Sequence, residues 1–372
     1  MAQTSANTAI PEGSWVLVTG VNGYVASHTA DQLLQRGYRV RGTVRNLSKS
    51  QWVEDLFREK YGVDHFELVQ VEDMTVPGAF DQAVKGVSGV AHVATILGHR
   101  SDLITSVIST NRNLLVSAAR EDTITRFVYT SSSEAATFSS FLEHKAGPST
   151  QISVDTWNEE AIRRSQTNAA MSPKRGFDMY AASKTLGEQA LWKWAEENRP
   201  GFVINTGKTN PPQKLPCTYD NVHNTVLPSV CFGATIDAKS QGHASSSGWP
   251  AAIFRNQFDQ VWPFLQHVIP TGAYCVDAED VALLHVAGLT HPEVKNERLF
   301  AFGHPFTWNE VVSIFRKAFP DRELPRELLG TGETFRYEIG PDAHAQEILR
   351  AMGKPGWSSL EDTLMANVSD MI

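Results

Sequence analysis

The chain has 372 residues, of which 41% are hydrophobic and 20% charged, with a formal net charge of -8 at pH 7. This length suffices for a large buried core, and the acidic balance without a basic block argues against nucleic acid or an anionic membrane as a partner. The three cysteines, Cys217, Cys231 and Cys275, lack CxxC spacing, which argues against a disulfide framework or a metal site.

The first residues of the chain carry no targeting signal that we can identify. Residues 1–13 are polar, without the basic and apolar regions of a signal peptide, and no run of about 18 apolar residues occurs. We expect a polar leader over 1–13 and a cytoplasmic protein. Its expected partner is a small-molecule substrate, and the sequence leaves open whether the chain is a monomer or a homodimer.

Residues 15–36, WVLVTGVNGYVASHTADQLLQR, have the pattern of a buried parallel strand, a glycine turn and a helix. Gly20 and Gly23 stand at G-x-x-G-x-x-A spacing, where the first can take a positive φ and the second lets a pyrophosphate approach the backbone. The helix then begins near Tyr24 and Val25, with unpaired N–H groups and a positive dipole end. This stretch predicts a dinucleotide phosphate site rather than an ordinary tight turn.

The second predicted strand, residues 38–45, ends where the cofactor's ribose is selected. Enzymes that use NAD place an acidic residue there, about 20 residues beyond the glycines. No acidic residue occurs between Asp31 and Glu54; Arg45 and Lys49 stand there instead. Both suit a 2′-phosphate, so the sequence favours NADPH, although Arg45 can also be a solvated charge at a strand end.

A third strand is expected at residues 66–71. It leads into Glu72, Asp73 and Met74, where a carboxylate can accept a hydrogen bond from the adenine amino group. Asp73 can equally cap a following helix.

A fourth strand is expected at residues 87–93, followed by the small residues Ala94 and Thr95 at an edge where a dinucleotide lies. His92 in this strand is more simply a hydrogen-bonded core residue than a ligand.

Helical segments separate these strands and the next one. Helices are expected over 49–60 and 103–120, and a fifth strand over 126–130. Alternation of this kind predicts an α/β fold, a Rossmann-type doubly wound parallel sheet with every carboxyl end on one side.

The fifth strand ends in Thr-Ser-Ser-Ser, residues 130–133, and a helical segment about fifty residues later carries Tyr180 and Lys184. Tyr and Lys at i and i+4 share a helix face, so a lysine charge can favour ionisation of a phenol whose reference pKa is about 10. A serine hydroxyl, Ser132 first and Ser133 as the fallback, can hold a carbonyl oxygen while Tyr180 donates a proton.

These motifs together resemble a known family. TGVNGYVAS, RGTVR, VEDM, HVAT, YTSSS and YAASK follow the order and spacing of the extended short-chain dehydrogenases/reductases, within the NAD-dependent epimerase/dehydratase superfamily. Among these, the chain is most similar to the dihydroflavonol-4-reductase and fungal carbonyl (aldehyde) reductase branch. The resemblance extends to residues 276–281 and 353–357. Ala26 replaces a common glycine, which is an accepted variant.

The resemblance implies the role of each site residue. It assigns catalysis to Ser132, Tyr180 and Lys184, and cofactor contacts to Arg45, Lys49, Asp73, Ala94, Thr95 and Pro228. It also implies transfer of the pro-S hydride.

The second half departs from the family pattern. Residues 202–206 begin a sixth strand, but the Pro-rich segment 207–225 separates them from Val226-Leu227-Pro228. Three prolines and little periodicity exclude a central strand or helix within this insert. We hypothesise that it is a translated intron, since Gly-Lys can encode a GTAAG donor and its removal leaves an uninterrupted strand in frame.

Residues 226–372 are expected to complete the sheet and form a smaller substrate lobe, after an NADP-binding domain at 14–206. Trp262, Phe264 and His243 offer possible substrate contacts, though the aromatic residues suit a lobe core better. Expected lobe elements are a loop at 242–248 and helices at 249–258, 307–319 and 343–352.

The sequence therefore predicts NADPH-dependent reduction of a ketone or aldehyde, plausibly in fungal secondary metabolism. A nucleotide-sugar epimerase or dehydratase shares the fold and triad but keeps NAD, which Arg45 disfavours. A non-catalytic NADP-sensing regulator is the third hypothesis, and the intact Tyr/Lys pair weighs against it.

Overall fold

A seven-stranded parallel sheet forms the centre of the molecule. The computed structural model describes residues 8–98, 101–137, 151–167, 170–200, 222–326 and 337–372. The sheet order is β3-β2-β1-β4-β5-β7-β10, and every pair of neighbours is parallel. The strands are β1 (Trp15–Val18), β2 (Arg39–Val44), β3 (Phe66–Gln70), β4 (Gly89–His92), β5 (Arg126–Thr130), β7 (Val222–Pro228) and β10 (Arg298–Ala301). This confirms the doubly wound fold, and the strand order reverses between β1 and β4.

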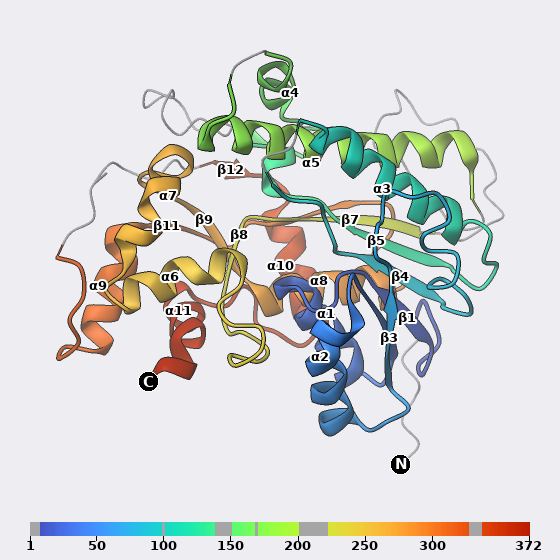
Figure 1. Ribbon diagram of the computed structural model, residues 1–372, viewed down its shortest axis with the longest axis horizontal. Coiled ribbons are helices and arrows are strands. Elements are labelled where there is room, and N and C mark those ends of the chain that lie inside the picture. Colours follow the sequence, from blue (N-terminus) through green and yellow to red (C-terminus); the bar gives the residue numbers. More distant parts are fainter. Residues whose placement is uncertain (1–7, 99–100, 138–150, 168–169, 201–221, 327–336) are drawn as a thin grey trace.

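Helices cover both faces of the sheet, as Figure 1 shows. On one side lie α3 (Leu103–Ala118), α4 (Glu159–Ser165) and α5 (Pro173–Asn198). On the other lie α1 (Tyr24–Gln35), α2 (Leu47–Tyr61), α8 (Ala278–Thr290) and α10 (Asp342–Ala351). Because helices cover both faces, the central strands β1, β4 and β5 are almost fully buried, whereas β2 and β3 toward the sheet's edge keep exposed polar residues such as Arg39 and Gln70.

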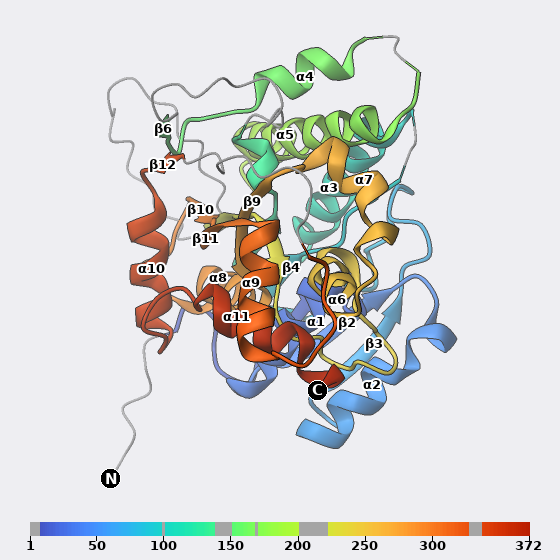
Figure 2. The ribbon, with the colours of Figure 1, turned by 90° about the vertical axis from the view of Figure 1, so that its left-hand side faces the viewer.

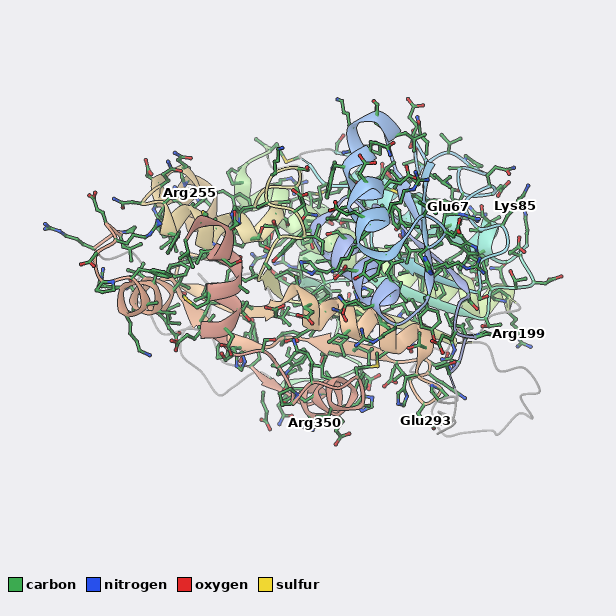
Figure 3. All side chains as sticks on the ribbon, turned by 90° about the horizontal axis from the view of Figure 1, so that it is seen from below. Glu67, Lys85, Arg199, Arg255, Glu293 and Arg350 are labelled. Atoms are coloured by element: carbon green, nitrogen blue, oxygen red, sulfur yellow. The ribbon has the colours of Figure 1, made fainter. Side chains whose placement is uncertain are left out.

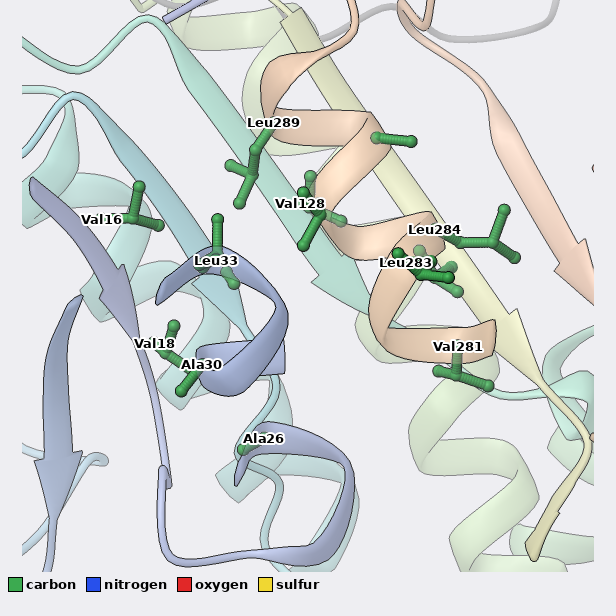
Figure 4. Packing of buried hydrophobic residues seen from close by; sticks show 14 of the residues in the cluster. Val16, Val18, Ala26, Ala30, Leu33, Val128, Val281, Leu283, Leu284 and Leu289 are labelled. Atoms are coloured by element: carbon green, nitrogen blue, oxygen red, sulfur yellow. The ribbon is translucent and has the colours of Figure 1, made fainter. Parts of the chain in front are cut away.

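The packing of α1 and α8 on the sheet explains the small residues of α1. Ala26 is 2% exposed and Ala30 is fully buried. They belong to the same cluster as Val18, and Figure 4 shows them facing the strand across a narrow gap. Large side chains at these positions would hold α1 away from β1, as the G-x-x-G-x-x-A spacing indicates.

A smaller lobe adjoins the carboxyl ends of the strands (Figures 1 and 2). Its sheet has the order β11-β9-β8, with β8 (Val230–Phe232), β9 (Gly272–Asp277) and β11 (His304–Thr307). Its helices are α6 (Gly248–Phe254), α7 (Trp262–Val268), α9 (Trp308–Ala318) and α11 (Leu360–Val368). A two-stranded sheet joins β6 (Gln151–Ile152) to β12 (Glu338–Ile339), and the short helices are η1 (Ser133–Ala135), η2 (Ser245–Ser247), η3 (Phe258–Gln260) and η4 (Ser369–Met371).

Helices α9 and α10 begin and end within one residue of the expected ranges 307–319 and 343–352, but α10 packs on α8 and β10 instead of in the lobe, and α7 and α11 were not predicted. Helix α9 has a capping box in which Thr307 and Glu310 bind each other's backbone N–H groups. The helix expected over 249–258 is shorter, because Asn256 has a φ of 55° and interrupts it after Phe254.

The last residues of the predicted insert 207–225 form part of a strand, which the sequence analysis excluded. Residues 201–221 lie outside the described part of the chain, but the last four residues of 207–225 belong to β7, between β5 and β10. The exclusion of a central strand is therefore wrong for 222–225. These residues, V-H-N-T, follow the last proline and have strand propensity of their own.

Residues 9 and 10 of the expected polar leader 1–13 pack against the folded domain. Ile10 is fully buried, and the Ala9 N–H donates to the Thr290 carbonyl oxygen at 2.8 Å. Across the described ranges, no helix combines the length and hydropathy needed to cross a membrane.

Candidate active site

The phosphate turn has the backbone that the glycines predict. Gly20 has a φ of 67°, and a Cβ placed there would lie 2.9 Å from the Ala94 Cβ. Gly23 precedes α1 as its N-cap with extended backbone, and a Cβ there would lie 3.1 Å from the Gly20 carbonyl oxygen. A side chain at either position would therefore be strained or crowded.

The N-terminus of α1 is open to an anion. No side chain caps it, and its first turn holds no acidic residue. The Val25 side chain is half-buried, whereas Tyr24 is 5% exposed and its hydroxyl donates to the Gly233 carbonyl oxygen at 2.8 Å. The Tyr24 side chain therefore ties α1 to the lobe, and only the backbone of this residue is left for the helix N-terminus.

Thr19 is a site residue that the sequence reasoning missed. Its buried Oγ1 accepts from the N–H groups of Val93 and Ala94, both at 3.0 Å, and lies 2.9 Å from His92 Nδ1. It thus fixes the end of β4 against the glycine turn. In the sequence, the one feature that could have identified Thr19 as a site residue is its position directly before Gly20.

His92 is the core residue that was expected. It is fully buried, its Nε2 lies 3.1 Å from Asn111 Oδ1, and burial lowers its pKa to about 3. A neutral imidazole with two hydrogen-bond partners has a structural role here.

Arg45 and Lys49 lie beyond the end of β2, where the ribose selector was predicted. Both are exposed, and Lys49 occupies the first turn of α2, whose N-cap Asn46 accepts from the Lys49 N–H at 3.0 Å. Two cations beside the phosphate turn give this end of the site a positive field.

Asp73 is exposed and accepts from both the N–H and the hydroxyl of Thr75, at 2.8 Å and 2.6 Å. It caps a turn, so the alternative that it caps a helix is wrong. The half-buried Met74 receives a hydrogen bond on its carbonyl from Asn113 at 3.1 Å. Both residues follow β3, at the edge that carries the other candidate residues.

Ala94, Thr95 and Pro228 lie at the carboxyl ends of β4 and β7. Ala94 and Thr95 are half-buried, and Pro228 is a buried final residue of its strand. The Ser131 N–H donates to the Val226 carbonyl oxygen at 2.8 Å, which brings the end of β7 beside the serine cluster. The structure thus gathers these residues along one sheet edge.

The three predicted catalytic residues meet where α5 crosses the end of β5. Tyr180 lies near the Ser132 hydroxyl, which acts to lower the pKa of the phenol, and Lys184 Nζ donates to the Thr130 carbonyl oxygen at 3.0 Å. Ser132 is 5% exposed and its hydroxyl also accepts from the Glu134 N–H at 3.2 Å. The contact with Tyr180 favours Ser132 over the fallback Ser133.

The protonation states differ from the expected ones. Burial raises the pKa of Tyr180 to about 12, against which the Ser132 hydrogen bond acts, so the expectation that Lys184 lowers it is wrong here. Lys184 is 2% exposed, and burial lowers its pKa to about 8 while Glu188 acts to raise it. Desolvation is the largest cause of both shifts, because burial disfavours the charged form of each group.

The substrate side of the site is bounded by the lobe, where α7 packs against α5 (Figure 2). Trp262 packs on Phe258 in the lobe core, with their tilted rings 5.5 Å apart between centroids. Phe264, by contrast, is 38% exposed. Phe177 lies one helical turn before Tyr180, with ring centroids 6.1 Å apart. His243 is buried with its Nε2 3.3 Å from Asp370 Oδ1, which makes it a tie to the C-terminus.

Comparisons with known proteins agree with this geometry. The profile of the NAD dependent epimerase/dehydratase family matches residues 16–210. An aldehyde reductase 2 of Sporidiobolus salmonicolor is 35% identical over 96% of each chain. The chain belongs to the NAD-dependent epimerase/dehydratase family.

Further members of this family are also similar to it. Ketoreductase adrE of Penicillium roqueforti is 34% identical over 98% of each chain. The crystal structure of Gre2 from Candida albicans in complex with NADPH has a TM-score of 0.74 at 23% identity, covering 97% of this chain and 98% of that one. The reductase branch expected from the motifs is thus confirmed among its relatives.

Proposed function

We propose that the chain is an NADPH-dependent reductase of ketones or aldehydes in which Tyr180, Lys184 and Ser132 are the catalytic residues. The observation that carries the proposal is the meeting of the three side chains at the carboxyl edge of the sheet, where Lys184 donates to the Thr130 carbonyl oxygen and the Ser132 hydroxyl acts to lower the pKa of Tyr180. The names of the relatives, an aldehyde reductase and a ketoreductase, support the reaction class.

The residues present fit the cofactor. The uncapped N-terminus of α1 suits the pyrophosphate, the crowded Gly20 suits close backbone approach, and the exposed Arg45 and Lys49 suit a 2′-phosphate. When bound, NADPH supplies the hydride. Asp73, Met74, Ala94, Thr95 and Pro228 are the remaining proposed contacts.

The protein's own groups then manage the proton and the developing charge. Tyr180 holds its proton at neutral pH because its pKa is about 12, and it donates that proton to the carbonyl oxygen. Ser132 donates a hydrogen bond to the same oxygen and orients it. Lys184 holds the ribose and keeps a positive charge near the tyrosinate that forms.

The pocket favours an apolar substrate, since Phe177 lies beside Tyr180 and joins the lobe's apolar cluster. The names of several fungal ketoreductases among the relatives support a role in secondary metabolism. A cytoplasmic location is consistent with Cys231 and Cys275, which are free thiols buried within the described residues.

The test is NADPH oxidation at 340 nm with a panel of ketones and aldehydes. Tyr180→Phe should lower kcat by about 10²–10⁴-fold while leaving NADPH affinity unchanged, because it removes the proton donor alone. Turnover unaffected by this substitution would remove Tyr180 from the mechanism. NADPH binding by the unmodified chain without any turnover would favour a regulator.

A further inference from the structure

Glu188 is a buried carboxylate that the proposed mechanism does not use. It is fully buried, one helical turn beyond Lys184 on α5. Residues at i and i+4 share a helix face, so Glu188 and Lys184 belong to the same buried side of α5. A buried charge is costly unless it is paired and hydrogen-bonded.

The carboxylate is paired with Arg298 of β10. Arg298 Nε donates to Glu188 Oε1 at 2.8 Å and Nη2 to Oε2 at 3.3 Å. Arg298 also donates to the carbonyl oxygens of Val154 and Thr156, both at 2.8 Å, and its guanidinium lies 4.0 Å from the centroid of the Trp157 ring. The guanidinium is therefore fixed from several sides.

Three further side chains donate to Glu188: Trp192 Nε1 donates to Oε1 at 3.4 Å, and two hydroxyl groups donate from β7 and from the end of β5. The Ser131 hydroxyl donates to Oε2 at 2.6 Å and the Thr225 hydroxyl to Oε1 at 2.9 Å. Two consecutive residues of this strand end are thus held by one face of α5, Thr130 by Lys184 and Ser131 by Glu188, while Tyr180 on the same face lies near Ser132.

A buried ion pair is often no more stabilising than well-packed apolar side chains of the same volume, so stability alone is a weak reason for Glu188. We propose that Glu188 is a positioning residue of the reduction, whose oxygens hold the strand end that carries Ser132 and whose negative charge lies on the same face of α5 as Lys184. This inference rests on the proposed function of Lys184 and Ser132.

Glu188 is the acidic side chain on the same face of α5 as Lys184, and the two histidines nearby are neutral at physiological pH. His92 on β4 is neutral above a pKa of about 3, and His285 on α8, 2.6 Å from the Thr130 hydroxyl, is neutral above a pKa of about 4. The groups around Lys184 and Glu188 are Tyr180 and Trp192 on α5, Tyr129 on β5, His92 on β4, Thr225 on β7, Arg298 on β10, and Glu134 after β5.

The experiment compares Glu188→Gln with Glu197→Gln, the same change at an exposed position of the same helix. Glutamine keeps the size of the side chain and removes its charge. In Glu188→Gln, the pH at which kcat/KM for reduction falls on the alkaline side should be about 1 unit lower. The reason is that a nearby opposite charge shifts a pKa by about 1 unit or more, and this variant removes that charge from beside Lys184. Glu197→Gln should keep the limb of the unmodified protein, and Glu188→Asp should restore most of it.

A second readout does not depend on turnover. The Lys184 signal in ¹³C-lysine NMR, identified by its loss in Lys184→Arg, should titrate about 1 pH unit lower in Glu188→Gln. If Glu188→Gln does not fold, the double variant Glu188→Gln/Arg298→Gln is used in its place, because it does not leave the Arg298 guanidinium buried without its carboxylate partner. An unchanged Lys184 titration overturns the inference. Absence of turnover in the unmodified protein, with the titration shifted as expected, would instead contradict the proposed function alone.

Discussion

At the scale of single residues, burial sets the charge state of the site. Lys184 is protonated below its lowered pKa of about 8, and Tyr180 is protonated below about 12. Reduction needs both protons, so the Lys184 pKa sets the alkaline limit.

We therefore expect kcat/KM for reduction to be level at neutral pH and to fall as pH rises through about 8, because Lys184 then loses its charge. Rates measured with NADPH from pH 5 to 10 check this. Lys184→Arg, which stays charged throughout, should lack the fall at that pH. A fall near pH 8 that persists in Lys184→Arg would assign the limb to another group.

The choice of cofactor also belongs to the residue scale. Arg45→Glu should weaken NADPH binding by about 10–100-fold, since a charge-assisted hydrogen bond to phosphate contributes about 1.5–3 kcal/mol. NADH binding should change little, because NADH lacks the 2′-phosphate. Fluorescence titration with both cofactors measures the difference. Lys85→Glu, an equal charge reversal at an exposed residue before β4, is the control.

At the scale of elements, β7 is where sequence and structure differ most. Residues 203–206 read V-I-N-T and residues 222–225 read V-H-N-T, and the second copy occupies the strand. There Asn224 donates to the carbonyl oxygens of Gly288 and Val294, and Thr225 donates to Glu188. Either copy supplies the same Asn and Thr when it stands directly before Val226.

We expect deletion of residues 207–225 to leave a folded reductase with an unbroken strand. Its Tm should stay within about 3 °C of the unmodified protein, which corresponds to about 1 kcal/mol for a large domain. Deletion of 203–221 is the matched control, because it removes the same number of residues. The strand then reads F-V-H-N-T-V, whereas deletion of 207–225 leaves F-V-I-N-T-V.

The two deletions also test the intron hypothesis at the protein level. Loss of NADPH binding in both would show that the intervening segment is required. Sequencing the mature transcript tests the hypothesis directly, and a message that retains the segment would contradict it.

At the scale of the whole molecule, the lobe and the sheet domain meet around the phosphate turn. Gln241 Nε2 donates to Ser27 Oγ at 2.9 Å, His28 Nε2 lies 2.9 Å from the Ala234 carbonyl oxygen, and Tyr24 reaches Gly233. Charged side chains such as those of Lys85, Arg255 and Arg350 project at the periphery (Figure 3). The cofactor site therefore lies against a junction that both parts support.

NADPH should accordingly stabilise the molecule as one unit. At 100 times its Kd it should add about 2.7 kcal/mol to the free energy of unfolding, and a thermal scan should show one transition that moves upward. NADH at the same concentration should give a smaller shift. Two separate transitions, with the upper one unmoved by NADPH, would show that the lobe unfolds independently of the site.

The sequence by itself determined the Rossmann-type sheet and the glycine turn, and it supplied the residues that we propose for catalysis. These are local patterns: an apolar run before glycines at fixed spacing, and a Tyr and Lys one helical turn apart. The tertiary structure alone decided which copy of V-x-N-T enters β7, which way Tyr24 points, and how burial shifts the pKa of Tyr180 and Lys184. It also decided that Glu188 meets Ser131 and Arg298, because those contacts join elements far apart in the chain and the cost of burying charge depends on all of them together.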